Sequence, residues 1–105
     1  MTAEYATMGQ YEEPGNLQKS VWGLTLASAA TVTPTHKFHL VSGTAELATI
    51  TVPYDGFSGA IFFVATGAWT CATSGNIAKT LTAVANAIVM FVYNPVTAKW
   101  YPHVP

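Results

Sequence analysis

The side chains that could perform acid–base or nucleophilic chemistry are few and scattered along this chain. Asp55 is the only aspartate, and the adjacent pair Glu12-Glu13 is far in sequence from Glu46. Glycoside hydrolysis needs two carboxylates across a cleft, and nucleophilic catalysis needs a nucleophile, a base and an orienting group in contact. The chain also lacks a Gly-x-Ser-x-Gly motif. We therefore predict that the protein is not an enzyme and assign no catalytic residues.

Histidine and cysteine provide little material for a metal site or a reactive thiol. His36 and His39 are three residues apart, and on a β-strand that spacing places the two side chains on opposite faces. Within one chain they are therefore not expected to bind a metal together, although a symmetric trimer could gather three copies of one histidine. Cys71 is the only cysteine and has no basic neighbour in sequence, which indicates a small buried apolar side chain. We expect neither a metal nor a cofactor.

Charge is scarce throughout the 105 residues. Charged side chains make up 9% of the chain, the net charge is -1, and the four basic residues are all lysines. Arginine supplies most bidentate contacts to phosphate, so its absence argues against a nucleic acid partner. The uncharged stretches 56–78 and 80–98 are interrupted by glycines or by Asn-Pro, which is not typical of membrane helices, and residues 1–5 do not resemble a signal peptide. We expect a soluble protein in a reducing compartment with no membrane partner.

So few charges also bear on self-association. A domain of this size leaves roughly a third or more of the surface of its unfolded chain in water. Here that surface would consist mostly of Thr, Ser, Ala and aromatic side chains, and weakly polar patches usually mark surfaces that a partner covers. The composition predicts an oligomer or a subunit bound to a lattice.

Short strands must position these side chains. Residues 24–32 and 47–52 alternate between apolar and polar side chains, whereas 60–65 and 87–93 are apolar on both faces, as in central strands between two layers. Residues 98–101 are expected to pair back on the preceding strand. Seven or eight such strands predict a single all-β domain over 21–105, either a β-sandwich or a jelly-roll-like fold.

The segment from 76 to 88 is ambiguous. Ile77, Leu81, Val84 and Ile88 occur at helical spacing, and Asn76 could cap a helix. The β-branched residues among 80–84 favour the alternative, which is a loop followed by a strand. We favour the loop and strand.

Residues 1–20 have neither a helical nor a strand period. They contain three of the five acidic residues and four spaced apolar anchors, Tyr5, Met8, Tyr11 and Leu17. This segment is either a disordered terminus or an extended arm that docks on a neighbouring molecule, with those four residues as candidate contacts. Fully extended, it would reach roughly 65–70 Å.

The three tryptophans are candidates for stacking on sugars. Trp22, Trp69 and Trp100 could form an aromatic platform with nearby tyrosines, but aromatic side chains most often belong to a core or an interface. Carbohydrate binding is therefore an alternative hypothesis.

A series of motifs between residues 26 and 101 resembles small β-structured virion proteins of tailed bacteriophages. The motifs are 26–35 (LASAATVTPT), 39–44 (HLVSGT), 50–59 (ITVPYDGFSG), 74–78 (SGNIA) and 91–101 (FVYNPVTAKWY). The stretch from 26 to 101 that contains them is about three quarters of the chain, and the order of the motifs is more distinctive than any one of them. The turn at 93–97 is longer than the Tyr-Asp-Gly turn expected in such proteins, a departure that affects this loop alone.

This resemblance implies a capsid decoration (cement) protein. Such a protein binds the major capsid protein on the assembled head shell, as a homotrimer, at the capsid surface of a virion assembled in the host cytoplasm. Similar modules occur on tails and fibres, so the resemblance also admits a receptor- or carbohydrate-binding module. The chain lacks the long repetitive shaft of a fibre, which favours decoration.

Overall fold

The computed structural model describes residues 21–104, and these residues form ten β-strands and no α-helix. The strands are β1 (Leu26–Ala27), β2 (Thr31–Val32), β3 (Phe38–Ser42), β4 (Glu46–Leu47), β5 (Thr49–Ile50), β6 (Gly59–Ala65), β7 (Thr70–Cys71), β8 (Leu81–Thr82), β9 (Ile88–Asn94) and β10 (Lys99–His103). The predicted all-β class is confirmed. The predicted arm, residues 1–20, lies outside the described residues.

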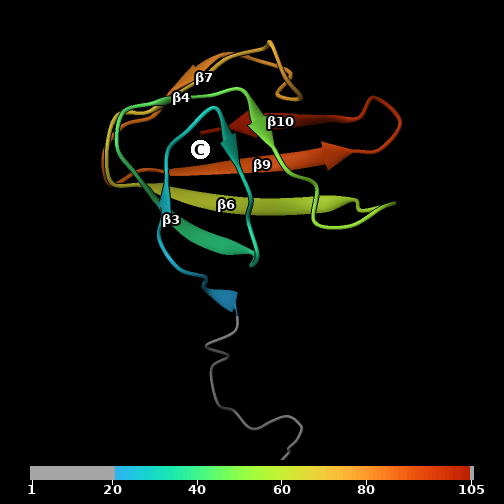
Figure 1. Ribbon diagram of the computed structural model, residues 1–105, viewed down its shortest axis with the longest axis horizontal. Helices are drawn as coiled ribbons and strands as arrows, with labels where there is room; N and C mark the ends of the chain where they lie inside the picture. Colours follow the sequence, from blue (N-terminus) through green and yellow to red (C-terminus); the bar gives the residue numbers. More distant parts are fainter. Residues whose placement is uncertain (1–20, 105) are drawn as a thin grey trace, which may run out of the picture.

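One large sheet dominates the structure. Its strand order is β1-β3-β6-β9-β10, with β6 and β9 at the centre (Figure 1). A pair, β2-β5, and a three-stranded sheet, β4-β7-β8, form separate smaller sheets. The arrangement is consistent with a β-sandwich in which one layer is much larger than the other.

The first half of the chain is wound into stacked coils. β1, β3 and β6 are parallel neighbours, and the same stacking makes β2 parallel to β5 and β4 parallel to β7. The chain then reverses, and β8, β9 and β10 each pair antiparallel with a preceding strand. The jelly-roll prediction is not confirmed, because jelly rolls are antiparallel throughout.

Glycine allows two coils to approach closely at one corner. A Cβ atom built on Gly67 would overlap the carbonyl oxygen of Gly43 in the preceding coil. Gly43 itself has φ +87°, which side-chain-bearing residues rarely adopt. The sequence analysis did not predict this contact between Gly43 and Gly67.

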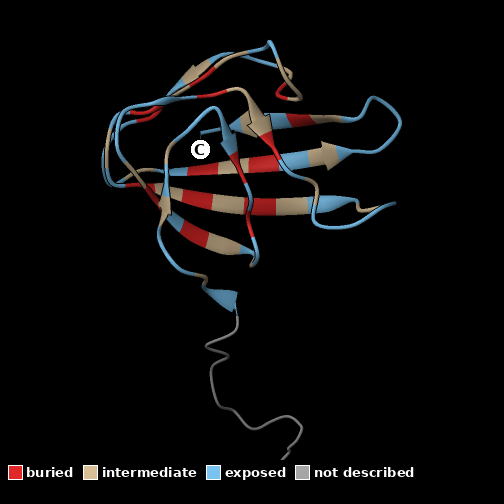
Figure 2. Cartoon of the chain, viewed as in Figure 1, coloured by how far each residue is buried: buried red, intermediate tan, exposed pale blue. Residues whose placement is uncertain are grey.

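The core lies on one side of the large sheet. Along β6, Ile61, Phe63 and Ala65 are buried while the residues between them are only partly covered, and β9 alternates in the same way (Figure 2). The remaining buried apolar residues come from the other strands of the large sheet, from the smaller sheets and from loops: Val32, Val41, Leu47, Ile50, Trp69, Cys71, Ile77, Ala83, Val89, Phe91 and Trp100. The expectation that both faces of 60–65 and 87–93 are buried between layers is therefore wrong for one face.

Other local predictions are confirmed. β10 pairs with β9 through the turn at 95–98, as the sequence indicated. The segment 76–88 is a loop containing the short strand β8, not a helix. The apolar residues at helical spacing do not form one buried face: Ile77 is in the core, whereas Val84 is 66% exposed.

Candidate interaction surfaces

The side of the large sheet that faces away from the core is largely apolar. Strand register places Phe38, Phe62 and Met90 in one row across it, with Leu40, Val64 and Ile88 in the next. We define the outer face by the apolar residues that share this side: Trp22, Phe38, Leu40, Ala60, Phe62, Val64, Ile88, Met90, Val92 and Tyr101. Three polar residues of β9 and β10 lie on the same side: Lys99 pairs with Asn94 at one end of the sheet, and His103 pairs with Met90 on the edge strand.

Aromatic rings at one side of the outer face stack in series. The ring centroids of Trp22 and Phe38 are 5.1 Å apart and those of Phe38 and Phe62 are 5.0 Å apart, with interplanar angles of 26° and 17°. Trp22 is 47% exposed, and Lys37 Nζ lies 6.0 Å from the centroid of the Phe62 ring. The Lys37 ammonium group can therefore interact with the Phe62 ring from the border of the outer face.

The exposed members of the outer face are spread across it. Leu40, Ile88, Val92 and Tyr101 are between 37% and 48% exposed, and they come from β3, β9 and β10. The sequence signal for this surface was present in the two strands that are apolar on both faces. It was interpreted as burial, because sequence alone does not show whether a second layer covers a given side of a sheet.

Two of the three predicted sugar-stacking tryptophans are inaccessible. Trp69 and Trp100 are fully buried, and their indole N–H groups donate to the carbonyl oxygens of Val41 (3.1 Å) and Ile50 (3.0 Å). A ring without exposed surface cannot stack on a ligand, so the stacking prediction is wrong for these two. Trp22 retains the exposure that such a role needs.

The two histidines lie closer together than the sequence analysis expected. β3 begins at Phe38, so His36 precedes the strand, and its ring makes an edge contact with that of His39 at a centroid distance of 5.8 Å. His39 is fully buried, and its Nδ1 donates to the carbonyl oxygen of Leu24 (2.7 Å). Its Nε2 accepts from the backbone N–H groups of Thr35 (3.0 Å) and His36 (3.1 Å).

Those hydrogen bonds assign a structural role to His39. A carbonyl oxygen has no proton to give, so Nδ1 must carry the ring proton, and Nε2 must be the acceptor. Both ring nitrogens are therefore occupied. Among the described residues, no group of three or more His, Cys, Asp or Glu side chains could hold a metal ion.

Cys71 is buried in the smaller layer. Desolvation by burial raises the pKa of its thiol from 9.0 to about 12, and the nearby negative charge of Glu46 acts in the same direction. The thiol is protonated at neutral pH and hence a poor nucleophile. The sequence prediction of a small buried side chain at this position is confirmed.

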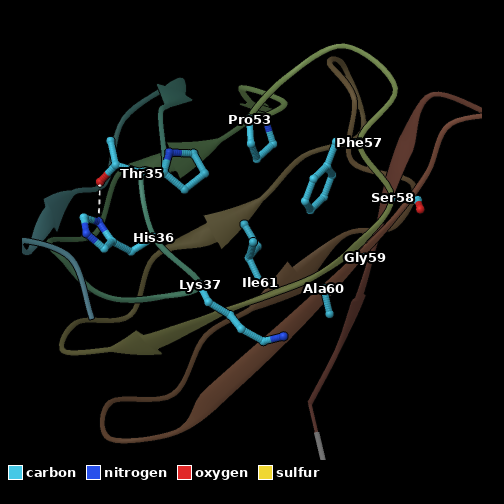
Figure 3. A pocket seen from close by; sticks show the side chains of 10 residues that line it. Thr35, His36, Lys37, Pro53, Phe57, Ser58, Gly59, Ala60 and Ile61 are labelled. Atoms are coloured by element: carbon cyan, nitrogen blue, oxygen red, sulfur yellow. Dashed lines mark hydrogen bonds between the residues drawn. The ribbon is translucent and has the colours of Figure 1, made fainter. Parts of the chain in front are cut away.

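Two shallow hollows lie near the turn at residues 53–59. In the first, of about 300 Å³, Pro53, Phe57 and Ile61 face the same space, with Lys37 and His36 at its rim (Figure 3). The second, of about 470 Å³, is lined by Val52, Tyr54, Asp55, Gly56, Tyr93 and Pro95. An apolar floor with few polar groups is typical of small-ligand sites, but neither hollow gathers convergent polar side chains.

The four candidate contacts of the predicted arm, Tyr5, Met8, Tyr11 and Leu17, lie outside the described residues. Within residues 21–104 there is no helix long and apolar enough to cross a membrane. Comparison with family models, curated proteins and solved structures finds no match.

Proposed function

We propose that this chain is a capsid decoration protein of a tailed bacteriophage, which binds the major capsid protein on the assembled head shell and stabilises it. In this proposal the chain acts as a homotrimer at the capsid surface of the virion. The motifs that resemble phage virion proteins support it. In the structure the motifs contain β1, β2, most of β3 and the adjoining parts of β9 and β10, whereas nearly all of the central strand β6 lies between two motifs.

The observation that carries the proposal is the nearly uncharged character of the folded part. Residues 21–104 contain five formally charged side chains: Lys37, Glu46, Asp55, Lys79 and Lys99. Soluble domains ordinarily carry about 25% charged residues, which keep free monomers apart in solution. A surface this poor in charge suits a subunit that is covered by other proteins once it is assembled.

Mass action supplies the mechanism. A subunit that binds only the assembled shell lowers the free energy of that state in proportion to its affinity and occupancy. Repeated contacts across a lattice add avidity, so modest individual sites resist internal pressure together. Residues 1–20, with Tyr5, Met8, Tyr11 and Leu17, are the proposed anchor to the shell.

The copy number of the chain in purified virions tests the assignment. A simple stoichiometric ratio to the major capsid protein, measured by quantitative mass spectrometry, supports decoration. The few copies typical of a tail component would overturn it, as would absence from the particle. Deletion of residues 1–20 tests the anchor: a folded variant that still binds the shell with unchanged affinity would transfer the contact to the β-domain.

A receptor- or carbohydrate-binding module of a tail or fibre is the second candidate. The exposed ring of Trp22 favours it, because an aromatic ring held by stacking on Phe38 offers a flat surface to a sugar. Titration of the protein with host surface glycans, followed by tryptophan fluorescence, tests this candidate. A response that persists in a Trp22→Ala variant would exclude Trp22 as the stacking residue.

A further inference from the structure

We infer that the outer face of the large sheet is the surface through which copies of this chain bind one another. The inference rests on the proposed function only for the number of copies in the assembly. The contact itself follows from the surface, and it is separate from binding to the shell.

The size of the outer face fits an interface. Five strands about 4.8 Å apart, with a mean length near five residues rising about 3.3 Å each, project an area of roughly 400 Å². Protruding side chains, Trp22 among them, make the accessible area larger than this projection. The apolar area of the outer face therefore approaches the ~500 Å² per partner that a specific interface needs. It is comparable to the largest apolar patch on a typical monomer, and such patches are often functional.

The distribution of exposed apolar side chains also singles out this face. Val92 pairs with Tyr101 of the adjacent strand, Met90 joins Val92 to Ile88 along the same side of β9, and the register places Leu40 across β6 from Ile88. The most exposed apolar residues elsewhere, such as Val84 and Val96, lie in loops or turns and belong to no row of neighbours. Scattered single residues of that kind are normal, whereas on the outer face the exposed apolar residues adjoin one another, as they do in patches that serve as interaction sites.

The absence of charge argues for a second copy as the occupant. An average protein surface is rich in charged side chains, and covering the outer face with one would strip water from those charges without pairing them. Another outer face brings no charge to the contact, so apolar area is buried on both sides without that cost. The charged side chains near the face, Lys37 and Lys99, lie at its border, where they stay in water.

A pair of matched variants tests the contact. Val92→Glu places a carboxylate on the outer face between Ala60 and Tyr101. Val96→Glu makes the same change four residues later in a turn, where Val96 is 90% exposed. Sedimentation equilibrium should give a multiple of the 11.1 kDa chain mass for the native protein. Val92→Glu should raise the dissociation constant by at least tenfold, and Val96→Glu should leave it unchanged.

Tryptophan fluorescence gives an independent measurement. Trp22 is the only exposed tryptophan of the three, so acrylamide quenching reports on it almost alone. Quenching should fall as the protein concentration rises, and this concentration dependence should be lost in Val92→Glu. If Val92→Glu unfolds, Ile88→Glu at the border of the face, where Ile88 is 48% exposed, replaces it.

The outcomes separate this inference from the proposed function. A native protein that is monomeric at about 100 μM, or equal dissociation constants for the Val92 and Val96 variants, overturns the contact. A mass of two chains supports the contact and overturns the trimer. An oligomer that depends on the outer face but does not bind shells supports this inference and overturns decoration.

Discussion

The side-chain amide of Asn76 pairs with both backbone groups of Ile50. Its Oδ1 accepts from the Ile50 N–H (2.9 Å), and its Nδ2 donates to the Ile50 carbonyl (2.8 Å). The same carbonyl accepts from the indole of Trp100, and the backbone of Asn76 accepts from the N–H of Trp100 at 2.8 Å. Asn76 thus joins β5 to the C-terminal strand β10 and substitutes for a missing neighbouring strand.

Replacement of Asn76 by alanine should lower the free energy of unfolding by about 2–3 kcal/mol, because the Ile50 N–H loses its partner in a partly buried place. Urea denaturation followed by circular dichroism measures the loss. Asn94→Ala is the matched control: the Asn94 side chain accepts one exposed backbone hydrogen bond, from Val96, and its removal should cost less than about 1 kcal/mol. Equal losses in the two variants would contradict the bridging role.

His39→Phe should destabilise the protein by about 2–4 kcal/mol. Phenylalanine preserves an aromatic ring but leaves the N–H groups of Thr35 and His36 and the carbonyl of Leu24 without partners. His36→Phe, which removes a single hydrogen bond to the Thr35 hydroxyl, is the control and should change stability by much less. The same denaturation experiment compares the two, and a tolerated His39→Phe would show that these backbone groups find other partners.

Alkaline pH should destabilise the native protein through Cys71. The thiol has a raised pKa of about 12 when folded and 9.0 as its ordinary value, so the unfolded chain loses the proton first. The stabilising contribution is therefore complete below about pH 9 and falls as the pH rises toward the folded value. Between about pH 8 and about pH 10.5 the native protein should lose about 2 kcal/mol relative to Cys71→Ala. Parallel pH slopes for the two proteins would disprove this assignment.

Gly67→Ala should cost about 1–3 kcal/mol by overpacking, because the new methyl group meets the carbonyl of Gly43. Gly56→Ala provides a different comparison: nothing lies within 4 Å of its Cβ position, but φ is +82°, so its cost is backbone strain of about 1–2 kcal/mol. The Thr66–Trp69 segment near Gly67 should lose amide protection in hydrogen exchange only in Gly67→Ala. Unchanged protection there would show that the two coils separate freely.

Sequence patterns predicted the strands that depend on local residues. The predictions failed for side chains whose environment is decided by residues distant in the sequence. The β9–β10 pairing followed from an Asn-Pro turn between two β-prone segments, and the structure has it. Asn76 was considered only as a cap in the helical alternative that the sequence did not favour, and its actual role was missed because nothing in the sequence places Ile50, 26 residues earlier, beside it. Trp69 and Trp100 are indistinguishable from Trp22 by local pattern, and only the tertiary fold buries the first two.

The stacked coils also make folding dependent on contacts between distant residues. Leu26 pairs with Val41, Phe38 pairs with Phe62, and the Trp100 indole binds a carbonyl 50 residues away. Chains with such distant pairings must close large loops before those contacts contribute, so they fold slowly. During that interval β6 and β9 present apolar side chains on both sides. Slow folding therefore prolongs the time during which a newly made chain exposes surfaces that promote aggregation.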